Sequence, residues 1–152
     1  MVTKELLDEI GHKIPIIIGP TAVGKTNFAI ELARKIDGEI ISIDSRQIYK
    51  GFKIGTAQPT IDEQLLIPHY LVDITHPREV ISAGKYIKLI KDSIFQIKEK
   101  NKKPIIAGGT MLYIQALCFG IIDQADSNPE YRQKYFDQIK AGDVNFLLNK
   151  LK

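Results

Sequence analysis

The segment with the clearest capacity for chemistry is residues 19–26, which read Gly-Pro-Thr-Ala-Val-Gly-Lys-Thr and fit the pattern GxxxxGK[ST]. In such a loop the glycines let backbone N–H groups converge on one anion, the lysine reaches the terminal phosphates, and the threonine hydroxyl can hold Mg²⁺. This predicts a diphosphate or triphosphate site, with Thr26 as the Mg²⁺ ligand, formed by Gly19, Pro20, Thr21, Ala22, Val23, Gly24, Lys25 and Thr26. The loop does not identify the reaction, because the same cradle serves many chemistries.

Two further groups of polar residues follow apolar runs. Residues 44–47, Asp-Ser-Arg-Gln, come after the run 39–43, and residues 108–110, Gly-Gly-Thr, come after the run 104–107. A carboxylate, a hydroxyl, a guanidinium and an amide in succession can hydrogen-bond the edge of a nucleobase. Spacing alone leaves open whether Asp44 instead caps a turn or holds Mg²⁺ through water. It also leaves open whether residues 108–110 are only a tight turn and a helix cap.

The elements that must position these residues alternate along the chain. Apolar runs predict four strands, at residues 14–18, 39–43, 70–74 and 104–107, and the unbroken apolar character of the first suggests burial on both faces. Helical spacing of apolar residues predicts a helix at residues 25–36, a long helix capped by Ser82, and an apolar helix that ends near Gly120. The alternation predicts an α/β fold, a P-loop NTPase-like parallel sheet with helices on both faces. Ligands bind such sheets at the carboxyl ends of the strands, so the three polar groups are expected to converge there.

Residues 45–60 show no sustained periodicity and contain Gly51, Gly55 and Pro59. We interpret them as a long functional loop that crosses the ligand-binding edge. His69 and His76 lie beside prolines without a second ligand at metal spacing, which favours structural roles for both.

The composition is that of an ordinary soluble protein, with 152 residues, 44% hydrophobic and 26% charged. A net charge of +3 is compatible with a nucleic-acid partner but too weak to indicate one. The single cysteine, Cys118, excludes an internal disulfide and is expected to be a packed core thiol. No targeting signal and no apolar run near the ~20 residues of a membrane span are present, so we expect a cytoplasmic protein with no membrane partner.

The composition changes after Gly120. Asn128 and Pro129 are typical of a helix start, Gly142 of a helix end, and Asp143 is expected to cap a last helix whose pattern is cut at the final residue. A truncated helix and a sheet with only four recognisable strands suggest an N-terminal fragment of a larger protein.

Five ordered blocks carry a family resemblance: residues 19–26, 42–49 (Ser-Ile-Asp-Ser-Arg-Gln-Ile-Tyr), 55–59 (Gly-Thr-Ala-Gln-Pro), 68–74 (Pro-His-Tyr-Leu-Val-Asp-Ile) and 108–113 (Gly-Gly-Thr-Met-Leu-Tyr). Their order and spacing resemble the tRNA dimethylallyltransferases, the tRNA isopentenyltransferase or IPP transferase family, over residues 14–120 and more loosely to the end. The resemblance implies transfer of a dimethylallyl group from dimethylallyl diphosphate to N6 of the adenosine on the 3′ side of the anticodon. It implies Mg²⁺ as cofactor, the anticodon stem-loop of tRNA as partner, and a monomer when full length.

The resemblance also implies roles for individual residues. Asp44 matches the family base, and Thr110 matches the threonine beside the reaction centre. Residues 19–26 match the loop that binds the leaving diphosphate. Ser45, Arg46 and Gln47 match the segment that contacts the tRNA base, and Arg132 corresponds to a tRNA-contacting arginine. The domains implied are an incomplete core over residues 1–122 and the truncated start of a helical tRNA-binding insertion over residues 123–152.

Two departures from the family pattern bear on activity. Met111 stands where the family usually has glycine, and the family's C-terminal half is absent. Three other functions stay open: an adenylate isopentenyltransferase that uses free AMP or ADP, a small P-loop kinase that uses ATP with Mg²⁺, and a catalytically incomplete remnant that binds diphosphate or RNA.

Overall fold

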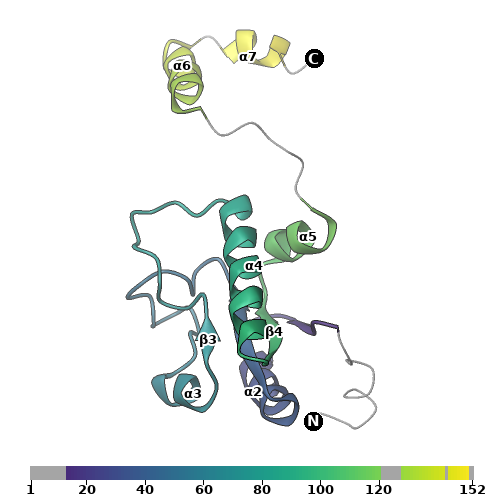
Figure 1. The fold of residues 1–152 in the computed structure, drawn as a ribbon. Helices are drawn as coiled ribbons and strands as arrows, with labels where there is room; N and C mark the ends of the chain where they lie inside the picture. The colour runs from purple at the N-terminus through teal and green to yellow at the C-terminus, as the bar shows by residue number, and fades with distance from the viewer. Residues whose placement is uncertain (1–12, 121–127, 143, 151–152) are drawn as a thin grey trace. The chain divides into compact units, whose positions relative to one another are not determined.

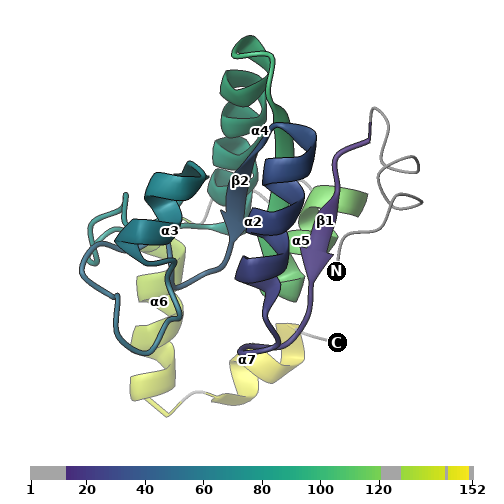
Figure 2. The ribbon, with the colours of Figure 1, turned by 90° about the horizontal axis from the view of Figure 1, so that it is seen from below.

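A computed structural model describes residues 13–120, 128–142 and 144–150 (Figures 1 and 2). The chain divides into two units, residues 1–120 and 121–152. The described elements of the first unit are β1 (Ile16–Ile18), α2 (Lys25–Ile36), β2 (Gly38–Ile43), α3 (Ile61–Leu66), β3 (His69–Tyr70), α4 (Ala83–Glu99), β4 (Lys103–Gly108) and α5 (Met111–Phe119). The second unit contains α6 (Pro129–Lys140) and α7 (Val144–Lys150).

The four described strands form one parallel sheet in the order β1-β4-β2-β3, which confirms the predicted fold class. The register aligns the last residues of three strands, because both Ile18 and Ile43 are partners of Gly108. The segments that follow these strands therefore start side by side at one edge of the sheet.

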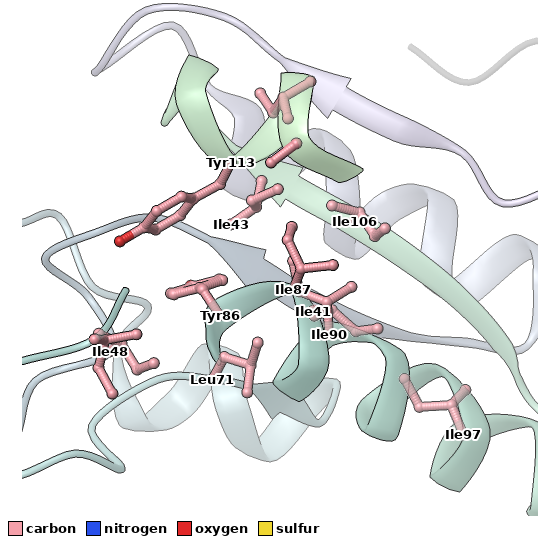
Figure 3. Packing of buried hydrophobic residues seen from close by; sticks show 13 residues of the cluster. Ile41, Ile43, Ile48, Leu71, Tyr86, Ile87, Ile90, Ile97, Ile106 and Tyr113 are labelled. Carbon is pink, nitrogen blue, oxygen red and sulfur yellow. The ribbon is translucent and has the colours of Figure 1, made fainter. Parts of the chain in front are cut away.

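Alternate residues of the central strands supply two cores, one on each face of the sheet. Ile40 and Ile105 pack with α2 on one face, whereas Ile41, Ile43 and Ile106 pack with α4 and α5 on the other (Figure 3). Burial of each such side chain contributes ~1.5–3 kcal/mol to folding. The predicted helices on both faces are thus confirmed, and they fix the strands whose ends carry the polar residues.

Two predicted strands differ from the observed ones. The first was expected to be buried on both faces, but β1 lies at an edge of the described sheet and Ile18 is 52% exposed. The third was expected to span residues 70–74, but β3 ends at Tyr70 because Leu71 and Asp73 adopt φ values of 61° and 57°. Such left-handed conformations interrupt a strand and are uncommon for a side chain as large as leucine.

Two further differences concern helices. The sequence analysis missed α3, whose first turn is fixed by a capping box between Thr60 and Glu63. The prediction of a packed core thiol was wrong, because α5 buries Tyr113, Ile114 and Ala116 and leaves Cys118 exposed.

The predicted helix starts and ends are otherwise well placed. The Ser82 hydroxyl accepts a hydrogen bond from Lys85 N at the start of α4, and the Asn128 side chain accepts one from Glu130 N at the start of α6. Gly142 adopts a φ of 81° after α6, and the expected cap at residue 143 lies outside the described residues. Of the helices in the described part of the chain, none combines the length and apolar character that membrane crossing needs.

Candidate functional site

The phosphate loop, residues 19–26, follows β1 directly and leads into α2. Its shape comes from backbone conformations with positive φ, at Gly19 (158°), Ala22 (65°) and Gly24 (89°). Gly24 is the N-cap of α2 and, as a glycine, has no side chain that could cap the helix. The positive end of the helix therefore faces the loop. The Lys25 ammonium donates to the Pro20 carbonyl oxygen at 2.6 Å, which folds it over the loop. This arrangement suits the binding of an anion.

Gly108, the last residue of β4, and Gly109 directly after it let the three strand ends approach closely. A Cβ atom at Gly108 would lie 2.4 Å from the Ile43 carbonyl oxygen, and one at Gly109 would lie 3.2 Å from the Gly19 carbonyl oxygen. Any side chain at position 108 would push β4 away from β2. The glycine pair is therefore a packing requirement of the site.

Thr110 joins two of the polar segments. Its Oγ1 atom accepts a hydrogen bond from Ser45 N at 3.0 Å, and its own N–H donates to the Ile43 carbonyl oxygen at 3.3 Å. Thr110 occupies the N-cap position of α5 but makes no side-chain cap bond to that helix. The threonine hydroxyl thus connects α5 to the β2 loop, which a plain helix cap does not do.

Asp44 stands at the carboxyl end of β2 and caps a turn with one oxygen. Asp44 Oδ1 accepts hydrogen bonds from Arg46 N at 2.8 Å and from Gln47 N at 3.2 Å. No described residue donates to the other oxygen, Oδ2. The turn-cap interpretation is right for Oδ1, whereas Oδ2 is available to a ligand.

Tyr86, on α4, fixes the backbone on either side of Asp44. Its buried hydroxyl accepts a hydrogen bond from Asp44 N at 3.2 Å and lies 3.0 Å from Ser42 O and 3.1 Å from Asp44 O. Burial raises the pKa of the Tyr86 phenol, so the hydroxyl keeps its proton and donates to one of these two carbonyls. The ring stacks on Tyr113 of α5, with centroids 4.3 Å apart.

The Gln47 side chain is occupied by the loop to which it belongs. Its Nε2 donates to Thr56 O at 3.1 Å and Ala57 O at 2.8 Å, and its Oε1 accepts from Ser42 Oγ at 3.0 Å. Arg46, in contrast, is exposed. The predicted contact of Gln47 with a base stays a prediction, and the described role of its amide is to hold residues 56 and 57 against β2.

Two adjoining cavities lie at this edge of the sheet, and Thr21, Lys25, Asp44 and Thr56 line both. The phosphate cavity has a volume of about 250 Å³ and is also lined by Ala22, Gly24, Thr26, Asn27, Gln47, Ala57, Ala107 and Gly108. The second cavity, named the acceptor cavity for the role proposed for it below, has a volume of about 320 Å³. It is also lined by Gly19, Pro20, Ser45, Arg46, Gly55, Gly109 and Thr110. The structure therefore brings together the predicted site residues of the first unit except Val23, which is 60% exposed and lines neither cavity. Arg132 belongs to the second unit.

The phosphate cavity fits a magnesium ion that is held mainly by phosphate and water. Thr26 and Asp44 supply oxygen atoms in its wall, the hard ligands that Mg²⁺ prefers. Within the described ranges, no cluster of three or more His, Cys, Asp or Glu residues could hold a metal by itself.

The IPP transferase family model matches residues 47–152, more than half of the chain. The chain belongs to the IPP transferase family. Among curated relatives, the tRNA dimethylallyltransferase of Halothermothrix orenii is 45% identical to this chain over 138 residues. The aligned region is 90% of this chain and 42% of that protein. The tRNA dimethylallyltransferase of Thermodesulfovibrio yellowstonii is 41% identical over 141 residues, which are 93% of this chain and 44% of that protein.

Solved structures of IPP transferases agree with the fold. The tRNA isopentenylpyrophosphate transferase of Bacillus halodurans superposes with a TM-score of 0.69 and 37% identity, over 91% of this chain and 46% of that one. A eukaryotic dimethylallyltransferase described as acting on tRNA gives a TM-score of 0.69 and 30% identity, over 77% of this chain and 30% of that one. The chain spans less than half the length of these relatives.

The sequence analysis missed several residues of the site. Thr56 lines both cavities, and Gln58 Nε2 donates to Gln47 O at 2.7 Å. Both residues lie in the block 55–59, which is part of the family resemblance, and that resemblance is the signal that could have identified them. Tyr86 is not among the predicted site residues, because its contact with Asp44 spans 42 residues of sequence.

Met111 is the first residue of α5, is 54% exposed and has no positive φ, so its backbone does not require the glycine that the family usually has there. Arg132 is an exposed residue of α6 in the second unit, and its contact with tRNA stays a prediction. His69 and His76 each bond to nearby backbone, at Ile67 O and Arg78 N.

Proposed function

We propose that this chain carries the catalytic centre of a tRNA dimethylallyltransferase. The reaction is the transfer of a dimethylallyl group from dimethylallyl diphosphate to N6 of the adenosine 3′ to the anticodon. The observation that carries the proposal is that Asp44 lines both the phosphate cavity and the acceptor cavity. A carboxylate at this junction is placed between a diphosphate donor and a nucleobase acceptor. The names of the relatives support the same reaction.

The transfer forms a bond between N6 of adenine and the allylic carbon, and it breaks the bond between that carbon and the diphosphate oxygen. The N6 amine is a poor nucleophile because its lone pair is delocalised into the ring. Asp44 Oδ2 takes the N6 proton as the new bond forms, while Oδ1 stays engaged by the backbone of residues 46 and 47. General-base assistance of this kind contributes ~10²–10⁴-fold to the rate.

The diphosphate leaves with the bonding electron pair and gains negative charge. The N–H groups of the phosphate loop and the Lys25 ammonium stabilise that charge, as preorganised donors do in other leaving-group sites. Thr26 would hold Mg²⁺, which supplies further charge stabilisation when it is bound.

The acceptor side receives a nucleotide that has left its base stack, at a cost of a few kcal/mol. In this proposal Ser45, Arg46, Gln47 and Thr110 contact the base and its neighbours, and Arg132 contacts tRNA from the helical insertion. The partner is the anticodon stem-loop of tRNA.

The test is incubation of the chain with tRNA and radiolabelled dimethylallyl diphosphate, with label in the tRNA as the expected result. Asp44→Asn should lower the rate by about 10²–10⁴-fold, since it removes the base but keeps the shape. Asp92→Asn, at an exposed position of α4, is the matched control and should leave the rate unchanged. An Asp44→Asn variant with the wild-type rate would exclude Asp44 as the base.

Three companion measurements, of phosphate transfer from ATP, of prenyl transfer to free AMP and of prenyl diphosphate binding, separate the other functions. Phosphate transfer from ATP without affinity for prenyl diphosphate would indicate a P-loop kinase. Labelling of free AMP in preference to a stem-loop would indicate an adenylate isopentenyltransferase. Binding of prenyl diphosphate without any transfer would indicate an incomplete remnant.

A further inference from the structure

We propose that Tyr49, Phe52, Ile54 and Pro77 form a stacking shelf for a nucleobase that flanks the modified adenosine. The shelf lies in a groove of about 540 Å³ beside the acceptor cavity. The inference rests on the proposed function for the identity of its ligand, a single-stranded segment of RNA. It adds a second contact with the RNA that lies outside the two cavities.

The groove adjoins the acceptor cavity. Ser45, Arg46, Gly55 and Thr56 line both spaces. A strand whose adenosine enters the acceptor cavity can therefore reach the groove with a flanking nucleotide. This adjacency favours the same RNA as the occupant over an unrelated partner.

The shelf is apolar, with two aromatic rings, and three of its residues are exposed while Tyr49 is half-buried. Ile54 is 97% exposed and Phe52 is 48% exposed. The rings of Tyr49 and Phe52 lie 6.2 Å apart at an angle of 55°. Single exposed apolar residues are ordinary, but here they line one groove next to a polar site. Stacking of a base on an aromatic ring contributes ~1–3 kcal/mol and accepts any base.

The shelf is held in place before any ligand binds. Lys50 N donates to Thr75 O at 2.8 Å, and Gly51 N donates to the Asp73 carboxylate at 2.8 Å. Gln58 Nε2 donates to Tyr49 O at 3.2 Å from the far side of the loop. A loop fixed by this many bonds presents its apolar residues outward at little ordering cost on binding.

The charge of the loop complements RNA. Residues 45–61 contain Arg46, Lys50 and Lys53 and no aspartate or glutamate. All three cations are exposed, and none takes part in the ion pairs of the described residues. Arg46 lines the groove, and Lys50 and Lys53 lie next to its aromatic residues in the sequence. Cations interleaved with aromatic residues are typical of proteins that bind single-stranded nucleic acid.

The experiment measures binding of an anticodon stem-loop RNA that carries 2-aminopurine next to the target adenosine. The wild-type chain should bind this RNA and change the fluorescence of the 2-aminopurine. Phe52→Ala should raise Kd by about 5- to 150-fold, the equivalent of ~1–3 kcal/mol, and should abolish the fluorescence change. Phe52→Tyr keeps the ring and should bind as the wild type does.

Phe95→Ala is the matched control, because Phe95 is 64% exposed but lies on α4 nine residues beyond Tyr86, about 13 Å further along the helix. It should leave Kd unchanged. Thermal melts of all variants check that each is folded.

An RNA without a base at the flanking position completes the design. The wild type should lose as much affinity for it as Phe52→Ala loses for the intact RNA, and the two changes together should cost no more than either alone. Additive losses, an unchanged Kd for Phe52→Ala, or a lack of RNA binding by the wild type would overturn the shelf. So would a Phe52-dependent dimer in sedimentation, which would assign the groove to a second copy.

Transfer of the dimethylallyl group is measured separately, so the two proposals can fail separately. Transfer with no role for Phe52 overturns the shelf alone. Binding that depends on Phe52 without transfer overturns the enzyme assignment alone.

Discussion

The two loops that contribute Lys25 and Asp44 to the cavities differ in what holds them. The phosphate loop, residues 19–26, takes its shape from left-handed backbone conformations, and Lys25 bonds to the loop's own carbonyl. The acceptor loop, residues 44–58, is fixed by side chains from β2, from α4, from the N-cap of α5 and from its own far end. Both loops contain left-handed residues, which in the acceptor loop are Gly51, Gly55 and Ala57. Among the described contacts, only the acceptor loop is also held by side chains of residues far away in the sequence.

The difference follows from the ligands that we propose for the two loops. A diphosphate carries several charges and makes strong bonds to the N–H groups that converge on it, so a loop preorganised by its own backbone is enough to bind it. An adenine is neutral and offers few hydrogen bonds. Its binding surface must be preorganised, because each group that has to be ordered on binding costs affinity.

The largest expected effect is on the phosphate side. Lys25→Met removes a charge that faces the leaving group and should lower kcat for dimethylallyl transfer by about 10²–10³-fold. The free energy of unfolding should change by less than about 0.5 kcal/mol, because the ammonium is exposed and bonds to one carbonyl. Lys98→Met, an exposed position on α4, is the control for lost charge.

Steady-state kinetics and urea unfolding measure the two quantities. If Lys25→Met were instead to destabilise the fold with little effect on transfer, the contrast between the loops would be wrong.

The second effect is on the acceptor side. Thr110→Val keeps the shape of the side chain but leaves Ser45 N–H without its acceptor, which should cost ~1–3 kcal/mol of stability. KM for the RNA should rise by about tenfold, as expected for ~1.4 kcal/mol of lost positioning, while Kd for the prenyl diphosphate should stay unchanged. Thr110→Ser restores the acceptor and should recover most of both losses.

Thermal denaturation, RNA titration in the transfer assay, and calorimetry with the diphosphate check these three values. A fall in diphosphate affinity would contradict the separation of the two sides, since Thr110 lines only the acceptor cavity.

The same contrast explains what the sequence could predict. The phosphate loop and the starts of α2, α4 and α6 depend on residues close together in the chain, and those predictions agree with the structure. The acceptor loop depends on contacts between distant positions. Tyr86 reaches Asp44 across 42 residues and Thr110 reaches Ser45 across 65, and no local pattern reveals such pairs.

The end of β3 was mispredicted for a related reason. Residues 70–74 are apolar enough for a strand, but Asp73 N donates to Gln47 O and Ile74 N donates to Ile48 O, both at 2.9 Å. These bonds favour the left-handed turn at Leu71 and Asp73 that supports the acceptor loop. The local preference for a strand is overridden by the loop that the segment supports.

The smallest expected effect concerns β3, the strand that comes directly before residues 71–74. His69 of β3 is half-buried, and burial lowers the pKa of its imidazole, against smaller opposing contributions from the Ile67 carbonyl and Glu63. Its Nδ1 lies 2.7 Å from Ile67 O, a bond that the neutral ring can make as the donor. Because the unfolded chain binds a proton more readily than the folded one, stability should rise with pH and be lost as the pH falls below about 6.5.

Urea unfolding between pH 5 and pH 8 measures this dependence. His69→Asn keeps a donor near the Nδ1 position but cannot take up a proton, so its stability should fall less on acidification than that of the wild type. His76→Asn, at an exposed histidine, is the control. Since β3 leads into the segment that holds residues 47–51, acid should weaken RNA binding before diphosphate binding. Equal weakening of both would show that the two loops do not respond separately to acid.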